Sequence, residues 1–226
     1  AIKPNYADAY LNMGNALKDQ GKSDMAIDAF NKALAIKPDY ALAHNNKGNI
    51  FNDQGKHLEA VESYNKAIAI APDYFEAHLN MGNTLREHGK LLESVESYKR
   101  AQAIKPDFAE AWLNMGVALK DQGQLEEAIE AFEEAIATKS DYAEAYNNMG
   151  IALNDQAKPV EATVAYNKAL TIKPNYAEAC LNLGNVLAEE NRLEEAINFY
   201  NKALAIKPDY AAAHRHLSLL NKYTID

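Results

Sequence analysis

The chain repeats one 34-residue pattern six times, and this periodicity constrains its fold more than any other feature. The first copy runs from residue 7 to residue 40. A fixed period of this length indicates a helical repeat array, in which each unit buries its apolar face against its neighbours. We therefore expect residues 7–210 to form six repeats of a single domain over residues 1–226. The glycine that marks the period stands at Gly14, Gly48, Gly82, Gly116, Gly150 and Gly184.

Two apolar patterns in each repeat predict two helices. In the first copy Tyr10, Met13 and Leu17 recur at helical spacing, and Phe30 and Leu34 do so later. A glycine follows the first pattern and can supply the left-handed backbone on which helices often end. Asparagine tolerates that conformation, whereas alanine is strained in it, so the helix boundary at Ala157 stays open, with Pro159 as an alternative signal for the start of the next helix. The position is occupied by Gly21, Gly55, Gly89, Gly123, Ala157 and Asn191.

The second helix of each repeat should end at a lysine that favours its C-terminal dipole, before a proline such as Pro38. The Asp or Asn after this position is expected to cap the next helix. Residues 211–223 repeat only the first half of the pattern, which predicts a C-terminal solvating helix. Residues 1–6, AIKPNY, match the end of a repeat, so we expect a remnant of a preceding one. The expected caps are Asp39, Asp73, Asp107, Asp141, Asn175 and Asp209.

Net charge and cysteine content narrow the function. The formal charge of −9 opposes binding to nucleic acid or to an anionic membrane surface, so we expect a neutral or basic protein partner. A single cysteine, Cys180, excludes an internal disulfide and favours a reducing compartment such as the cytoplasm. No stretch is long and apolar enough to predict a membrane span.

These spaced residues resemble the tetratricopeptide repeat (TPR) family: an aromatic residue, Met-Gly, a large apolar residue, then Ala, an aromatic, Ala and Pro. The resemblance covers residues 7–210. It implies an all-α fold, an α-solenoid in which antiparallel helix pairs form a right-handed superhelix. It also implies that the first helix of each pair lines a concave groove.

A polar stripe runs along the first helix of each repeat. Asp8, Asn12, Asn15 and Asp19 are spaced by 4, 3 and 4 residues, which places them on one helix face opposite the apolar side. We expect this stripe to line the groove. Its second position is Asn12, Asn46, Asn80, Asn114, Asn148 and Asn182, its third is Asn15, Asn49, Asn83 and Asn185, and its last is Asp19, Asp53, Glu87, Asp121, Asp155 and Glu189.

Two interpretations of the asparagines remain open. A primary amide both donates and accepts hydrogen bonds, so the asparagines could hold the backbone of an extended peptide, and the acids would favour basic side chains. Alternatively, the positions are merely solvated, or the asparagines make structural bonds within the fold. Asparagine is a poor helix former, which favours the first interpretation. On that interpretation the side chains face solvent, and replacing Asn80, Asn114 and Asn148 by Ala should leave melting nearly unchanged.

Two patterns from known families bear on the kind of partner expected. Sequences such as LNMGN are similar to the superhelix of O-linked N-acetylglucosamine transferases, which implies binding of an extended protein substrate, although the catalytic domain of those enzymes is absent from this sequence. TPR co-chaperones instead hold carboxylate termini with a clamp that begins with lysine. The first lysine site is occupied here by Leu11, Asn45, Leu79, Leu113, Asn147 and Leu181, which makes a chaperone-tail receptor improbable.

No catalytic or metal site is predicted, so we expect neither an enzyme nor a cofactor. His44, His78 and His214 occupy the aromatic position of the first helix and should pack, as should Cys180. His57 and His88 have no partner at metal-ligand spacing in the sequence. The leading function is thus a peptide- or protein-binding module. The alternatives are the substrate-recruiting arm of a larger enzyme, such as a glycosyltransferase, and a self-associating scaffold.

Weak association between copies is expected through the repeat ends. The first repeat has no designed cap, so it should expose apolar side chains more than the inner repeats do. The side chains expected to be exposed are Tyr10, Leu17 and Phe30.

Overall fold

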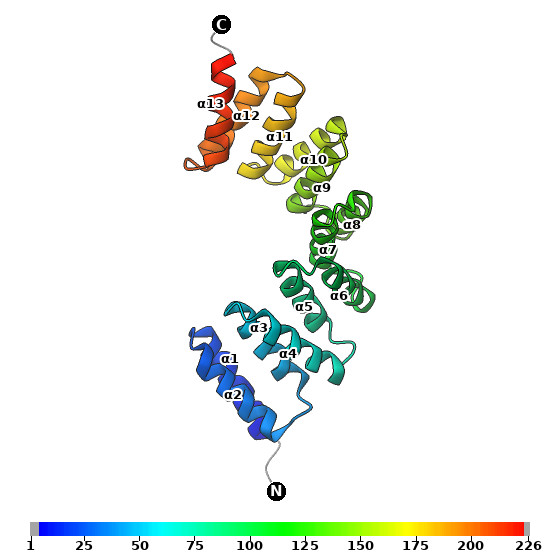
Figure 1. Ribbon diagram of the computed structural model, residues 1–226, viewed down its shortest axis with the longest axis vertical. Coiled ribbons are helices and arrows are strands. Elements are labelled where there is room, and N and C mark those ends of the chain that lie inside the picture. Colours follow the sequence, from blue (N-terminus) through cyan, green and yellow to red (C-terminus); the bar gives the residue numbers. More distant parts are fainter. Residues whose placement is uncertain (1–4, 224–226) are drawn as a thin grey trace. The chain divides into compact units, whose positions relative to one another are not determined.

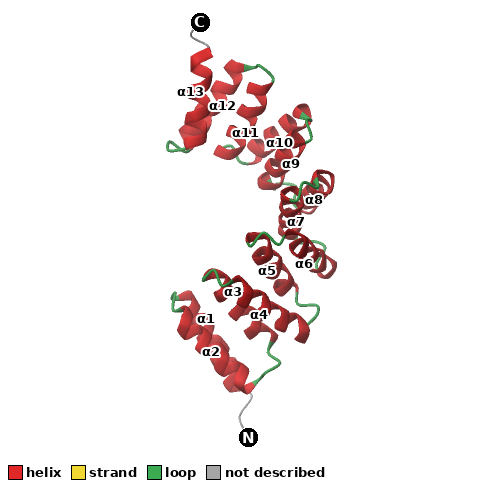
Figure 2. Ribbon diagram, in the orientation of Figure 1, coloured by secondary structure: helices red, strands yellow, loops and turns green. Residues whose placement is uncertain are grey.

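The computed structural model describes residues 5–223 as thirteen helices joined by short loops, with no strand among these residues (Figures 1 and 2). The all-α, helical-repeat class predicted from the 34-residue period is confirmed. The chain divides into two compact units, residues 1–118 and residues 119–226. The division falls inside α7 (Ala109–Asp121), and each unit is described by itself.

The first unit consists of three helix pairs and the start of α7. Each odd-numbered helix packs against the even-numbered helix that follows it (Figure 1). The predicted remnant of a preceding repeat lies partly outside the described residues, which begin at Asn5 in α1. The bounds are α1 (Asn5–Asp19), α2 (Ser23–Ile36), α3 (Ala41–Asp53), α4 (His57–Ile70), α5 (Phe75–Glu87) and α6 (Leu91–Ile104).

The second unit contains the end of α7 and six further helices. Its last helix stands where residues 211–223 predict a half repeat, and Ala213 is fully buried there. Within residues 5–223 no helix combines the length and the apolar character that a membrane span requires. The bounds are α8 (Leu125–Thr138), α9 (Ala143–Asp155), α10 (Pro159–Ile172), α11 (Ala177–Glu189), α12 (Leu193–Ile206) and α13 (Ala211–Tyr223).

The repeated glycine lets the two helices of a pair approach closely. A Cβ atom at Gly82 would lie 2.6 Å from Cε1 of Tyr98, whose ring is fully buried. Gly14 stands in the same relation to Phe30, at 2.5 Å. Phe30 is 0% exposed and Leu17 is 9% exposed, so the expectation that the first repeat exposes these two side chains is wrong. The helix partner within the same repeat covers Phe30, and a preceding repeat is not needed.

The left-handed helix ends predicted at the glycines and at Asn191 are confirmed, and Ala157, where the prediction was left open, takes the same backbone; the predicted caps are wrong. Gly21 has a φ of 71°, Ala157 a φ of 57° and Asn191 a φ of 61°. The N-cap of α3 is Tyr40 and not Asp39, and it makes no side-chain capping bond; α5, α9 and α11 also begin after a tyrosine without such a bond. A cation–π contact holds this turn instead, because Nζ of Lys37 lies 4.3 Å from the centre of the Tyr40 ring.

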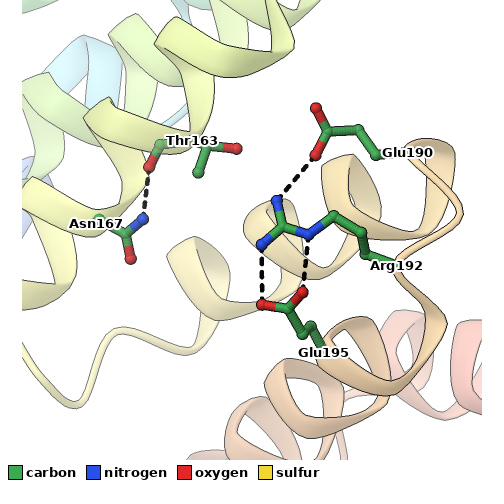
Figure 3. Close-up of polar contacts among 5 residues, drawn as sticks. All are labelled: Thr163, Asn167, Glu190, Arg192 and Glu195. Atoms are coloured by element: carbon green, nitrogen blue, oxygen red, sulfur yellow. Dashed lines mark hydrogen bonds and ion pairs between the residues drawn. The ribbon is translucent and has the colours of Figure 1, made fainter.

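Ion pairs stabilise the turn at Asn191. Among residues 5–223, no such pair stabilises the turn at Ala157. Arg192 pairs with both oxygens of Glu195, at 2.8 and 2.9 Å, and with Glu190 at 3.1 Å (Figure 3). The hydrogen bonds from Arg192 lower the pKa of the Glu195 carboxyl. These contacts span the end of α11 and the start of α12.

Replacing Ala157 by Gly should therefore raise the free energy of unfolding by about 0.5–1 kcal/mol. The left-handed backbone costs an L-residue about 1–2 kcal/mol, and the larger entropy of unfolded glycine offsets part of the gain. Urea titration followed by circular dichroism measures the change. Asn191→Gly is the matched control and should gain less, because asparagine tolerates this conformation. Equal gains at the two sites would contradict the assignment of strain to Ala157.

In the sixth repeat a small side chain replaces a ring at one core position, and a ring replaces a small side chain at another. Cys180 stands where the other repeats carry Tyr, His or Trp, and Phe199 stands where they carry Ala or Ser. Cys180 is buried, as expected, and burial raises the pKa of its thiol. Both side chains border a hollow of about 380 Å³ that Leu170 and Lys202 also line. The ring of Phe199 thus compensates in part for the missing aromatic side chain on α11.

Candidate peptide-binding surface

The polar stripe lies along the odd-numbered helices, where the helical spacing of its residues predicts it. We call the asparagines at its second and third positions the amide ladder. Asn12 is exposed, and the other ladder side chains are half-buried. The acids at the last position are all exposed: Asp19, Asp53, Glu87, Asp121, Asp155 and Glu189.

Ladder amides bond to one another between consecutive repeats. Nδ2 of Asn46 donates to Oδ1 of Asn15 at 2.8 Å, and Nδ2 of Asn114 donates to Oδ1 of Asn83 at 3.2 Å. A second register exists as well, because Asn80 donates to Asn45 at 3.2 Å. Asn182 donates in the same way to Asn147, at 3.1 Å. The expectation that ladder side chains only face solvent is therefore corrected.

Buried acceptors explain the second register. Asn45 is 3% exposed and Asn147 is 4% exposed. A buried amide without a partner is costly, so the next repeat supplies one. Asn148 follows a repeat with Val117 at the third position, and its amide donates instead to the Glu144 carbonyl of its own helix, at 2.9 Å. Alanine at Asn80 or Asn114 should consequently lower stability, unlike the expectation from the sequence.

Tyrosine hydroxyls also donate to amide oxygens at the third ladder position. Oη of Tyr64 donates to Oδ1 of Asn49 at 2.8 Å, and Oη of Tyr98 donates to Oδ1 of Asn83 at 2.7 Å. Tyr200 and Asn185 make the same bond at 3.0 Å. Each bond joins the two helices of one repeat, so the third ladder position has a structural role.

The NH2 groups at the third position remain available. Those of Asn49, Asn83 and Asn185 donate to no acceptor among residues 5–223, because their bonds there are all made through the oxygen. A row of amide donors can bind the carbonyl groups of an extended backbone. At the third ladder position the amide oxygen is therefore used within the fold, whereas the NH2 group can donate to a ligand.

A polar hollow of about 230 Å³ opens along this surface in the first unit. It brings five of the predicted site residues together from α3 and α5, and Asn52 crosses it to donate to Oε2 of Glu87 at 3.3 Å. The lining consists of Lys18, Asn49, Asn52, Asp53, Tyr64, Asn80, Asn83 and Glu87.

Burial is the main cause of the raised pKa values of the tyrosine hydroxyls. It raises the pKa of Tyr64, an interaction with Thr84 opposes the rise, and the negative charges of Asp53 and Glu87 add to it. In the second unit, burial followed by the charge of Glu189 raises the pKa of Tyr200 to about 12. Two carboxylates face one cation, Lys18, around the hollow, so the site favours a positively charged ligand group.

Sequence reasoning missed several residues of this surface. Lys18, Asn52 and Tyr64 line the hollow but lie outside the repeated stripe. Asn45 and Asn147 were recognisable as polar residues in a column that is otherwise leucine, which is the signal of a buried amide. Conversely, Asn12 has no ladder partner within residues 5–223, and Asn148 is bonded to its own helix.

The histidines on the first helix of each repeat are expected to pack, and they also make polar contacts. Nε2 of His78 lies 2.9 Å from the carbonyl oxygen of Pro72, and Trp112 donates to Pro106 at 3.1 Å in the same position. His44 and His214 make the equivalent contact with Pro38 and Pro208. Within residues 5–223 no group of three or more His, Cys, Asp or Glu side chains could hold a metal ion.

Comparisons with known proteins agree with this architecture. Models of the family described as TPR repeat match residues 48–89, 82–123, 116–156 and 184–222. Those described as tetratricopeptide repeat match residues 7–40 and 143–176. Among curated protein sequences, none matches this chain.

Several solved structures share this fold. MamA is 27% identical with a TM-score of 0.67, and the match covers 73% of this chain and 96% of MamA. YrrB, described as a TPR protein with an unusual peptide-binding site, is 22% identical with a TM-score of 0.68, covering 84% and 98%. PilF of Pseudomonas aeruginosa is 20% identical with a TM-score of 0.78, covering 95% and 97%.

Proposed function

We propose that this chain, which belongs to the tetratricopeptide repeat family, is a non-enzymatic module that binds an extended protein segment along its amide ladder. The observation that carries the proposal is the row of unused amide donors beside a polar hollow. A peptide-binding TPR protein among the similar folds, YrrB, is consistent with this use of the fold. The partner is a protein, and its segment is unstructured before it binds.

The ladder would bind the backbone of the peptide whatever the peptide's sequence. The NH2 groups of Asn49 and Asn83 would donate to peptide carbonyls, while their oxygens stay bonded to Tyr64 and Tyr98. Because the internal bonds orient the amides before binding, little side-chain entropy is lost on contact. The same arrangement recurs at Asn185 with Tyr200.

The exposed acids would select basic side chains of the segment. Asp53→Asn with Glu87→Gln should weaken a lysine-containing, unstructured peptide by about 0.2–1 kcal/mol per carboxylate, because exposed ion pairs are worth that much. A twin peptide with glutamine in place of lysine should change little. Fluorescence anisotropy at low and high salt measures both, and the difference should vanish at high salt.

A matched control removes the same charge elsewhere. Glu126→Gln with Glu130→Gln neutralises two exposed acids on α8 that lie outside the ladder. If this control weakens the lysine peptide equally, long-range charge and not the hollow explains binding. In that case the side-chain amide NMR signals of Asn49 and Asn83 should also fail to shift with either peptide, which would exclude the ladder as the site.

Two other contexts for the module follow from the sequence. The similarity to O-linked N-acetylglucosamine transferases suggests a substrate-recruiting arm, in which case the full-length gene encodes a transferase domain. A self-associating scaffold instead requires concentration-dependent assembly, which analytical ultracentrifugation of this chain measures. The ladder favours neither context over simple peptide binding.

A further inference from the structure

Two histidines from neighbouring repeats meet at the turns of the first unit. His57 is the first residue of α4, and His88 follows the last residue of α5 as its C-cap. They are 31 residues apart in the sequence, yet their ring centres are 5.3 Å apart and the ring planes are tilted by 35°. His88 is exposed and His57 is half-buried, so both rings can be reached from solvent.

A chain of hydrogen bonds sets the tautomer of His57. Nδ2 of Asn52 donates to Oε2 of Glu87 at 3.3 Å, which identifies the other atom of that amide as the oxygen. This oxygen lies 3.1 Å from Nδ1 of His57. Since the oxygen can only accept, Nδ1 must carry the hydrogen, and Nε2 of the neutral ring keeps its lone pair. Metal-binding histidines commonly have this kind of support on the nitrogen that does not bind the metal.

The spacing of the rings suits one shared ion. Two imidazoles that bind a tetrahedral ion through nitrogens at about 2.0–2.1 Å place their ring centres about 5 Å apart. His88 caps the C-terminal end of the α5 dipole, and the carboxylate of Glu87 accepts from Asn52, the same residue whose oxygen contacts His57; both negative charges favour a cation nearby. No hydrogen bond within residues 5–223 occupies the ring nitrogens of His88.

Other histidines lack these features. Nε2 of His44, His78 and His214 faces a proline carbonyl, so it serves as a donor inside its own repeat. His216 stacks on the ring of Tyr200, with 5.6 Å between the ring centres. His57 and His88 are thus distinguished by the fixed tautomer of His57 and by a second imidazole from the adjacent repeat.

We propose that His57 and His88 bind one divalent transition-metal ion of the Zn²⁺ class, with Asn52 as a positioning residue and water completing the coordination. Neutral imidazole is a preferred ligand of Zn²⁺, Cu²⁺ and Ni²⁺, whereas Mg²⁺ prefers oxygen ligands. The ion would tie the second repeat to the third. Its two ligands lie outside the lining of the polar hollow, although Asn52 and Glu87 belong to both.

Calorimetric titration of the intact, tag-free chain with Zn²⁺ tests the site. We expect saturable binding of one ion, which His57→Gln and His88→Gln each abolish, and which Asn52→Ala weakens by about 10- to 100-fold. His214→Gln is the matched control and should bind as the natural chain does. Zn²⁺ should also raise the melting temperature of the natural chain but not of the His57→Gln, His88→Gln double variant.

Imidazole NMR gives a readout that a purely structural role would not move. Zn²⁺ should shift the ring signals of His57 and His88 alone, and Asn52→Ala should change the ¹⁵N shifts of His57 toward a mixture of tautomers before any metal is added. Absence of saturable Zn²⁺ binding, or equal binding by the double variant, overturns the site. Unchanged Zn²⁺ affinity in Asn52→Ala overturns the positioning role.

Discussion

Gly82→Ala is expected to lower the free energy of unfolding by about 2 kcal/mol. The added Cβ would lie 2.6 Å from one carbon of the Tyr98 ring and 2.8 Å from another. The ring is 0% exposed, so it cannot move aside without disturbing the core. Overpacking of this kind costs about 1–3 kcal/mol or more, and the better helix propensity of alanine returns up to about 1 kcal/mol. The midpoint of urea denaturation measures the loss.

A double-mutant cycle isolates the steric cause. In a Tyr98→Ala background the clash is gone, so Gly82→Ala should become neutral or stabilising. Tyr98→Ala alone is destabilising, and the comparison is therefore made between the two proteins that both carry Tyr98→Ala. If Gly82→Ala costs the same with and without the ring, close packing of the helix pair does not explain the repeated glycine.

The second large effect is loss of stability as pH rises above about 10. Burial raises the pKa values of Tyr64, Tyr98 and Tyr166 above the ordinary range, and that of Tyr200 to about 12. Unfolded tyrosine has a pKa of about 10. Between these values the folded chain holds protons that the unfolded chain has lost, so the free energy of unfolding decreases with pH. The contribution of each tyrosine is complete below pH 10 and is lost as pH rises through its own folded pKa, which is about 12 for Tyr200.

Several tyrosines act together, and each adds up to about 1.4 kcal/mol for every unit by which its pKa is raised. Urea midpoints at pH 9, 10 and 11 measure the decline, and tyrosinate absorbance should appear together with unfolding. Tyr166→Phe is an informative variant, because Ile151 replaces the amide that the other tyrosines bond and Phe132 fills the same position in the fourth repeat. It should keep its stability at pH 8 and lose less at pH 11.

Titration of all the tyrosines near pH 10 without loss of helicity would contradict this expectation. The hydroxyls of Tyr64, Tyr98 and Tyr166 would then be accessible to solvent in the folded chain. The bonds from Tyr64 to Asn49 and from Tyr98 to Asn83 would in that case not hold the helix pairs together.

Local regularities made the helices predictable from the sequence. The 34-residue period, the spacing of apolar residues and the glycine at each left-handed helix end act within one repeat, so they determine the helix pairs without knowledge of longer-range contacts. Ala157 marks the limit of this reasoning, because the sequence left the helix boundary there open, and only the structure shows that alanine takes the left-handed backbone of the other repeats. The error over the caps was also local, since a cation–π contact at Tyr40 replaces the expected bond from Asp39.

Partners across repeats were decided only by the tertiary structure. The sequence identifies Asn80 and Asn114 as ladder positions. It does not reveal that Asn80 donates to a residue 35 positions earlier, whereas Asn114 donates to a residue 31 positions earlier. His57 and His88 likewise have no relation in the period, and they meet because the turns of adjacent repeats pack together. The direction of a side chain and the identity of its partner depend on how one helix pair packs on the next. The spacing of residues along a single helix carries no information about that packing.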